Sequence, residues 1–278
     1  MKSLKPFAAL LFLLVLQTSE AQSDSTPQKP QLKISLNYNT ALNYYGRTDS
    51  LKSTGFFPLA ELWFTSKLYV NAAPIFTNNS LQRLAYAGTV ASAGYQNVGE
   101  KWISSLYVTK PFYKENSELV QSALKAQSGA SFTFQNNVLN ITAGGDVKFS
   151  DKVDYGATAG LDHLVRIQAT ENSVVIFDPT TTIYGGTQNF QRSYYKKVKP
   201  GVLLFPGSSQ QVTENVSRFN VLAYELSVPV IYASGKVLLM ATPSYILPQN
   251  LISVPGRPDL SERGGNLFYA TLTAKYSF

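Results

Sequence analysis

Apolar and polar positions alternate along most of the chain from residue 32 onward. The last eleven residues, 268–278, carry Phe, Ala, Leu, Ala, Tyr and Phe at every second position, with mostly polar residues between them. A period of two is that of a β-strand, whose successive side chains point to opposite faces of a sheet. Residues 32–44 repeat the pattern, which predicts that Leu42 and Tyr44 share an apolar face with Leu32 and Tyr38.

Turn signals between the alternating segments divide residues 31–278 into about twelve strands. The predicted spans are 32–45, 55–65, 67–78, 83–96, 101–113, 126–136, 138–149, 152–168, 173–186, 217–233, 236–248 and 266–278. Ten or fourteen strands are also compatible with the pattern. Four prolines, at 58, 74, 229 and 243, fall inside these spans, and since proline donates no ladder hydrogen bond we expect a bulge or a strand end at each.

The lengths of these strands favour a transmembrane up-and-down antiparallel β-barrel over a soluble all-β fold. Most spans run to 10–15 residues, whereas strands of globular sheets are most often about 5–6 residues long. Aromatic residues near the ends of the apolar faces are typical of barrels that cross a membrane. Unpaired backbone groups are costly in hydrocarbon, so the last strand would have to pair with the first. A secreted sandwich or a lipocalin-like protein is the alternative.

The first 21 residues resemble a secretory signal peptide. Lys2 and Lys5 precede an apolar run over 7–16, and Ser19 and Ala21 are small residues spaced as at a cleavage site. The run is shorter than the roughly 20 residues that cross a bilayer as a helix, although a retained anchor is the alternative. We therefore expect export by the general secretory route, followed by a disordered leader over residues 22–30.

Composition agrees with export and removes several classes of chemistry. The chain has no cysteine, so disulfides cannot hold it together. It contains no phosphate-binding loop, nucleophile elbow or zincin motif, and we expect no cofactor, no metal and no enzymatic activity. Its one histidine, His163, falls on an apolar face with no serine motif beside it. The sequence therefore favours a packing or lipid-interface role for His163, and a surface lipid hydrolase that uses it is the third functional hypothesis.

The polar faces of the strands predict the lining of a lumen. The charged residues that the alternation places inward are Lys33, Glu61, Asp146, Lys148, Asp154, Asp162, Arg166, Glu225 and Lys275. Both signs are present, and such groups can line a water-filled pore or pair with one another and fill it. In a barrel of about twelve strands both outcomes are open, because eight strands leave a filled interior and sixteen leave a channel.

Two long connections carry further candidate features. The segment 187–216 contains a basic cluster, Arg192, Lys196, Lys197 and Lys199, which we expect to face the outside and contact anionic lipopolysaccharide. Its apolar stretch over 202–205 suits either a plug or a partner protein. Residues 115–126 have helical spacing and predict a short helix. Export argues against a nucleic-acid partner.

The C-terminal third resembles outer-membrane β-barrel proteins of Bacteroidetes-type bacteria. The resemblance lies in YELSVPVIYASGKVLLMATPSYILPQNL (224–251) and the closing strand, with GATAGLDHLVRI (156–167) and YGGTQNF (184–190) adding to it. It implies the outer membrane of a Gram-negative bacterium, contact with its lipids, and no assigned chemistry. Tyr276 and Phe278 resemble the terminal signal that the barrel-assembly machinery reads during insertion.

These features predict a non-enzymatic outer-membrane barrel with a structural or accessory role, beside a larger outer-membrane complex. A passive channel for small polar solutes is the alternative. Whether the lumen is open, which solute would pass, the oligomeric state and the fold of 187–216 do not follow from the sequence.

Overall fold

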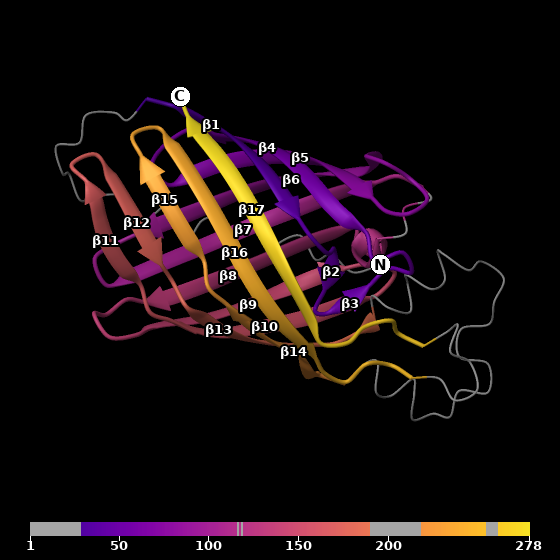
Figure 1. Ribbon diagram of the computed structural model, residues 1–278. Coiled ribbons are helices and arrows are strands. Elements are labelled where there is room, and N and C mark those ends of the chain that lie inside the picture. Colours follow the sequence, from indigo (N-terminus) through magenta and orange to yellow (C-terminus); the bar gives the residue numbers. More distant parts are fainter. Residues whose placement is uncertain (1–28, 116, 118, 190–217, 254–260) are drawn as a thin grey trace, which may run out of the picture.

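The computed structural model describes residues 29–278 apart from 116, 118, 190–217 and 254–260, and shows an antiparallel sheet closed into a barrel (Figure 1). The signal-peptide prediction over 1–21, most of the leader and the basic cluster of 187–216 lie outside the described residues. The strands of the barrel are β1 (Gln31–Asn39), β4 (Thr54–Trp63), β5 (Leu68–Asn78), β6 (Ala85–Val98), β7 (Trp102–Tyr113), β8 (Ala126–Phe134), β9 (Asn140–Phe149), β10 (Val153–Asp162), β11 (Val165–Thr170), β12 (Ser173–Phe177), β13 (Thr180–Gly186), β14 (Asn220–Ser227), β15 (Val230–Ser234), β16 (Val237–Pro248) and β17 (Leu267–Ser277).

Three of the wall strands are each interrupted once, so these fifteen segments form twelve strands. The interrupted pairs are β10 with β11, β12 with β13, and β14 with β15. This confirms the predicted fold class, a closed twelve-stranded antiparallel barrel with consecutive strands as neighbours. Within the described chain, no helix is long and apolar enough to cross a membrane.

The ends of the chain close the barrel. β1 pairs with β17 over seven consecutive positions, from Lys33 opposite Ser277 to Asn39 opposite Thr271. The amide of Phe278 donates one further hydrogen bond to the carbonyl of Leu32. Pairing of the first and last strands leaves neither of them with an open edge, as hydrocarbon requires.

Prolines mark the irregular positions in the wall. Pro229 separates β14 from β15, and the ladder between β4 and β5 is interrupted around Pro58. At Pro229 the ladder continues through the proline carbonyl, which accepts a hydrogen bond from the amide of Asp178 at 3.0 Å. The predicted strand end at Pro229 is confirmed. Pro58, Pro74 and Pro243 stay inside continuous strands, β4, β5 and β16. The unpaired stretch of the β4–β5 ladder covers both Pro58 and Pro74, and the register between β5 and β6 shifts beside Pro74.

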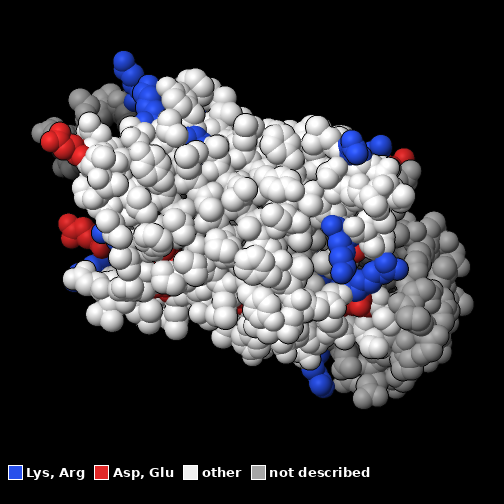
Figure 2. Space-filling view, viewed as in Figure 1, with Lys and Arg blue, Asp and Glu red and all other residues white. Residues whose placement is uncertain are grey.

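Apolar side chains cover the outside of the barrel. Along β1, Leu32, Ile34, Leu36 and Tyr38 are exposed, while the residues between them are half-buried or buried. On the face shown in Figure 2, charged residues gather at the two ends and the broad surface between them is almost free of them. An uncharged belt between two charged rims is the surface of an outer-membrane-type barrel.

The prediction for the first strand was wrong beyond Asn39. The chain turns inward there, and the Asn39 side chain accepts a hydrogen bond from the amide of Ala41 at 2.9 Å. Leu42 packs inside the barrel against Ile75, Ala87 and Leu119 rather than facing outward. Apolar residues suit the lipid face and a packed interior equally, so alternation alone did not distinguish them.

The inward chain then forms a short hairpin of β2 (Asn43–Tyr44) and β3 (Arg47–Thr48), which we call the plug hairpin. Its turn uses left-handed backbone at Tyr45 and Gly46, with φ of 55° and 75°. Tyr44 packs on Val120 and Leu124, at a 3₁₀ helix η2 (Val120–Ala123) within the predicted short helix. Figure 1 shows β2, β3 and η2 at the end of the barrel away from the C-terminus.

Candidate functional site in the barrel lumen

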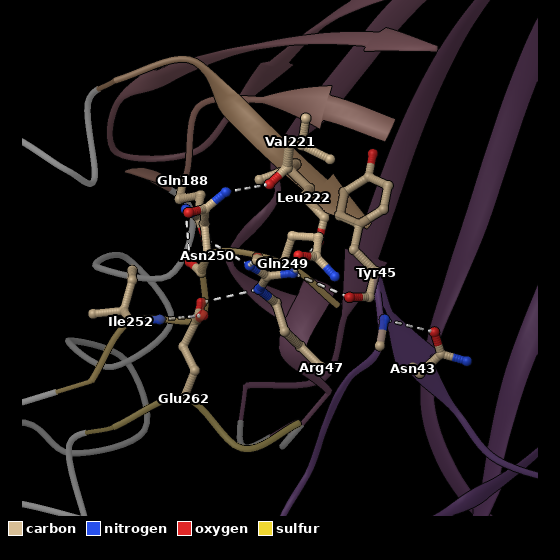
Figure 3. Close-up of polar contacts among 11 residues, drawn as sticks. Asn43, Tyr45, Arg47, Gln188, Val221, Leu222, Gln249, Asn250, Ile252 and Glu262 are labelled. Atoms are coloured by element: carbon tan, nitrogen blue, oxygen red, sulfur yellow. Dashed lines mark hydrogen bonds and ion pairs between the residues drawn. The ribbon is translucent and has the colours of Figure 1, made fainter. Parts of the chain in front are cut away.

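Arg47 of the plug hairpin is almost fully buried, with 1% of its surface exposed, the same fraction as Asp154. Its Nε donates to Glu262 Oε1 at 3.1 Å, and one terminal nitrogen donates to Gln188 Oε1 at 2.7 Å. The remaining bonds go to the carbonyl oxygens of Tyr45, Leu222 and Gln249 at 3.0–3.3 Å. One side chain thus ties the hairpin to a barrel strand and to two connections at this end (Figure 3).

The partners of Arg47 are themselves held in place. Glu262 accepts a second hydrogen bond from the amide of Ile252 at 2.7 Å. The Gln188 side chain donates to the carbonyl oxygen of Asn250 at 3.2 Å. The side-chain amide of Asn250 in turn donates to the carbonyl oxygen of Val221 on β14 at 2.9 Å. The network therefore fixes the segments 187–189, 249–252 and 262–264 around the hairpin.

Glu262 lies outside the barrel strands, in the connection between β16 and β17, and is almost fully buried. Burial raises the pKa of its carboxyl group, while the positive charge of Arg47 and the Ile252 amide oppose the rise. Removal of a carboxylate from water disfavours the ionised form. Burial and the two partners of Glu262 therefore act on its pKa in opposite directions, and burial has the larger effect.

Below the plug hairpin, an ion pair and aromatic rings occupy the lumen. Lys148 pairs with Asp146 on the same strand, and both are largely buried. The Lys148 ammonium also lies 5.7 Å from the ring centre of Tyr45 in the hairpin turn. A Cβ added to Gly156 would meet the oxygen of Asp146 at 2.4 Å, so this pair lies directly over the neighbouring strand.

A second cluster centres on Glu225 of β14, three strands along the wall from β9. Its two carboxylate oxygens accept hydrogen bonds from the hydroxyl groups of Tyr269, at 2.7 Å, and Tyr184, at 3.1 Å. The Tyr184 ring lies 5.2 Å from that of Tyr45. The hairpin turn is therefore in contact with side chains from both parts of the wall.

A third set of charges lies near the end of the barrel where β1 begins and β17 ends. Lys275 of β17 forms a salt bridge with Glu61 of β4. Lys33, on the strand between them, lies 4.5 Å from the ring centre of Trp63. Inward charges at this level are thus partnered across adjacent strands.

The structure brings most of the predicted lumen residues to the inner face, but into separate groups. Asp154 is buried and accepts a hydrogen bond from the amide of Asn189 at 2.8 Å. Asp162 accepts one from Asn140 at 2.7 Å. The prediction that Arg166 lines the lumen was wrong, because this residue lies on β11, where every residue is exposed. The reason is that β11 and β12 extend past the turn between β8 and β9 and pair only with each other and β15.

Sequence reasoning missed the residues that hold the plug hairpin. Arg47, Gln188 and Glu262 all fall between the predicted strand spans, where no alternation assigns a face. The signal that was present is the Tyr45-Gly46 pair directly before an arginine, at the boundary between the first predicted span, 32–45, and the connection that follows it.

His163 and the terminal aromatics lie on the periphery. His163 is exposed, and its Nδ1 donates a hydrogen bond to the carbonyl of Val138 at 2.6 Å. Tyr276 of β17 and Phe278, directly after the strand, are exposed, with ring centres 4.8 Å apart. Among the described residues, no group of three or more His, Asp or Glu could hold a metal ion.

The sequence matches no protein-family model and no curated protein sequence. Solved structures that resemble the chain include a KdgM porin, at 8% identity and a TM-score of 0.48, covering 88% of this chain and 99% of the porin. An outer membrane channel from Pseudomonas putida F1 matches at 11% and 0.45, over 93% of this chain and 100% of the channel. LpxR from Salmonella typhimurium matches at 10% and 0.41, over 88% and 99%. The barrel assignment rests on this chain's own strand pairing.

Proposed function

We propose that this protein is an integral outer-membrane barrel whose resting lumen is closed at one end by the plug hairpin, and that its role is structural or accessory rather than enzymatic. The observation that carries the proposal is Arg47, which is 1% exposed and bonded to five partners. A guanidinium group is buried to this degree only when its hydrogen-bond donors are satisfied. The hairpin is therefore a built part of the barrel interior.

Contacts at other levels support a closed resting state. The Asp146–Lys148 pair lies beneath the hairpin turn, and Lys275 pairs with Glu61 nearer the other end. Paired charges of opposite sign cancel much of the field that would otherwise draw ions through the lumen. A barrel filled in this way presents its surface, rather than a pore, to the rest of the membrane.

Conductance in planar bilayers tests the proposal directly. We expect the purified full-length protein to insert without producing discrete current steps under moderate voltage. Frequent, uniform steps from the wild type would overturn the closed resting state.

A passive channel for small polar solutes is the second candidate. The observation in its favour is that the hairpin is tied to the wall and the connections by hydrogen bonds of a single side chain, Arg47. Replacing a hydrogen bond within the protein by one to water has a small net free-energy cost. A hairpin held in this way can therefore leave the lumen and return to it. Current steps that appear only after the hairpin is loosened would favour this candidate.

The proposed setting is the outer membrane of a Gram-negative, Bacteroidetes-type bacterium. The uncharged outer belt and charged rims support contact with outer-membrane lipid and lipopolysaccharide. Insertion would use the barrel-assembly machinery, with Tyr276 and Phe278 as the terminal signal, after export by the general secretory route. Purification of the native complex from membranes tests whether a larger assembly accompanies the barrel.

The non-enzymatic part of the proposal has its own test. The Nδ1 of His163 donates to a backbone carbonyl rather than to a carboxylate of the kind that orients the histidine of a catalytic dyad. We expect purified protein to release no fatty acid from phospholipid or lipopolysaccharide. Hydrolysis that disappears in His163→Ala would establish the third reading instead.

A further inference from the structure

The edge of β11 (Val165–Thr170) is open along the strand. β11 pairs with β12 on one side and, within the described chain, with no strand on the other. Its neighbour in the wall would be β9, but β9 reaches only to Asn140, opposite Asp162 of β10. Figure 1 shows β11 and β12 as a hairpin at the end of the barrel where β17 terminates. One side of this hairpin therefore lacks the neighbour that the other wall strands have.

Both faces of β11 are accessible. All six of its residues are exposed, which holds for no other strand of the described chain. In β1, by contrast, the inward residues Lys33, Ser35 and Asn37 are half-buried or buried. β11 thus projects beyond the packed lumen, and a second polypeptide can reach its edge.

Two unmet requirements coincide at this edge. An edge strand carries backbone N–H and C=O groups that have no partner in the sheet. Because such groups are costly in hydrocarbon, β11 must lie at or beyond the membrane surface. Its outer face is nevertheless apolar, since Val165 and Ile167 are 40% and 50% exposed and lie opposite Phe177 and Val175 of β12. Unpaired backbone beside an exposed apolar face is typical of a site where another chain adds a strand.

The tip of the hairpin is protected against pairing, whereas its base is not. The register shifts between Gln168 and Thr170. The Gln168 side chain also donates hydrogen bonds to the carbonyl oxygens of Thr170, at 2.7 Å, and Ser173, at 3.2 Å. Irregular pairing of this kind is one way in which proteins block an edge. The ladder from Val165 to Gln168 is regular, so this part of the edge can accept a strand.

Arg166 gives the edge its selectivity. It is the one charged residue of β11, it is exposed, and it has no hydrogen-bond or ion-pair partner among the described residues. A charge on an edge disfavours strands that cannot neutralise it and favours those that bring the opposite charge. Opposite charges at facing positions of paired strands stabilise the pair. The matching segment therefore carries a carboxylate where it passes Arg166, with apolar residues on either side.

A second copy of this chain fits the edge poorly. Copies inserted into one membrane share their orientation and are related by rotation about the membrane normal. This rotation leaves the two β11 strands running in the same direction, so they cannot form an antiparallel ladder. It also places the apolar face of one strand beside the polar face of the other. The geometry therefore favours a different polypeptide as the occupant.

We propose that the edge of β11 binds an extended segment of another protein, which adds a strand to the hairpin and places an Asp or Glu side chain beside Arg166. In outer-membrane barrels the short turns face the periplasm, and the short β8–β9 and β15–β16 turns lie at this end. The partner is therefore a periplasmic protein. Only this location rests on the proposed outer-membrane setting, and the edge does not depend on whether the lumen is closed.

Fluorescence anisotropy with a labelled peptide tests the edge. The probe is a short peptide in which valine alternates with threonine around one central glutamate, and the receptor is the full mature chain in detergent micelles. We expect saturable binding, whether or not the protein conducts in bilayers. Absence of saturable binding would overturn the proposal and would leave the conductance result untouched.

Two N-methylated peptides separate backbone pairing from apolar adhesion. One carries methyl groups on its odd-numbered amides and the other on its even-numbered amides, so each loses the donors along one edge only. One form should bind about tenfold more weakly than the other, because each strand added to a ladder uses a single edge. Equal affinities would show adhesion without strand addition and would overturn the proposal.

The charge requirement is tested with Arg166→Glu. This variant should bind the glutamate peptide about tenfold more weakly than the wild type does, and a peptide with lysine in place of the glutamate more tightly. Lys152→Glu is the matched control, because it makes the same change of charge at an exposed residue in the turn between β9 and β10, at the other end of the barrel. Equal effects of the two variants would overturn the proposal.

Two other occupants of the edge are tested separately. The chain has no cysteine, so Ile167→Cys reports a second copy. A disulfide-linked dimer in native membranes that is absent from the control Leu161→Cys, an exposed position on the paired strand β10, would overturn the proposal. Removal of residues 22–30 should leave peptide binding unchanged. Binding that appears only after this removal would show that the chain's own N-terminal segment occupies the edge, and would also overturn the proposal.

Discussion

All five N–H groups of Arg47 meet an acceptor within 3.3 Å. Guanidinium is the one side-chain group that offers five donors in a fixed plane, which lysine cannot reproduce. Glu262 supplies the opposite charge, and the other four acceptors are neutral. At this scale, the position of the plug hairpin depends on a single residue whose partners come from distant parts of the chain.

Loss of Arg47 should release the hairpin. Arg47→Ala leaves the Glu262 carboxylate buried without its counter-ion, and breaking a buried pair in this way costs about 3–5 kcal/mol. Since about 1.4 kcal/mol corresponds to a factor of ten, local opening should become at least about a hundred times more frequent. The chain has no cysteine, so Ala123→Cys, at a buried position in η2, reports opening through its rate of labelling by a water-soluble maleimide.

The matched control is Arg166→Ala in the same background, because Arg166 is exposed on β11. We expect labelling at the rate of the Ala123→Cys protein itself. Equal labelling rates for the Arg47 and Arg166 variants would mean that the hairpin does not depend on Arg47.

The pH dependence of stability should carry the signature of Glu262. Its pKa is raised in the folded protein, so its contribution to stability is fully present below the pKa of an exposed glutamate and is lost as pH rises through the folded value. Glu262→Gln cannot titrate. The difference in melting temperature, wild type minus variant, should therefore be larger at pH 5 than at pH 7.

Thermal unfolding in detergent at both pH values measures this difference, and the subtraction removes the titration of other groups. A difference that grows toward pH 7 would show that pairing with Arg47 outweighs the effect of burial on Glu262.

At the scale of elements, the wall strands and the plug hairpin differ in what constrains them. A wall strand must show apolar groups to lipid and polar groups to the lumen, so its sequence alternates and its approximate span could be predicted. The hairpin faces only the packed interior and has no alternation to follow. Leu42 and Tyr44 continued the apolar pattern of β1 by chance of spacing, and only their contacts with Leu119 and Val120 show that they turn inward. Gln188 and Glu262 also lie outside the alternating strands, so the sequence pattern did not predict their positions either.

Gly88 should be the most sensitive glycine of the wall. The register between β5 and β6 shifts beside it, and a Cβ at this position would lie 2.7 Å from the carbonyl oxygen of Phe112 and 2.8 Å from the Cα of Tyr113. These are backbone atoms of the adjacent strand, which cannot move aside without breaking the ladder. Gly88→Ala should lower stability by about 1–3 kcal/mol, in the range of overpacked sites.

Urea titration of the refolded barrel in micelles measures this loss. Gly265→Ala is the control, because nothing lies within 4 Å of a Cβ there. Similar midpoints for the two variants would show that β6 and β7 can separate locally without cost.

At the scale of the whole molecule, the barrel is closed by its first and last strands, and the face shown in Figure 2 carries an uncharged belt. β17 pairs with β16 on one side and with β1 on the other. Removal of residues 276–278 deletes the pairs of Tyr276 with Ile34 and of Ser277 with Lys33. We expect this truncation to reduce the fraction of protein that migrates as a compact, heat-modifiable band on a denaturing gel.

The double variant Tyr276→Ala, Phe278→Ala separates two causes. It keeps the backbone pairs and removes the aromatic side chains. If it folds in vitro as the wild type does while the truncation does not, backbone pairing is responsible. Equal failure of both would assign the loss to the side chains.

The seam between β1 and β17 also sets how the chain must fold. Thr273 donates a hydrogen bond to Asn37 across 236 positions of sequence, whereas most other neighbours in the wall are consecutive hairpins. Local hairpins can form early, but this contact has to wait until nearly the whole polypeptide has been synthesised, and contacts of such high order are slow to form. During that interval both terminal strands expose open edges that can join a second molecule. The organism that makes this protein must therefore keep the nascent chain apart from its copies until the ends meet.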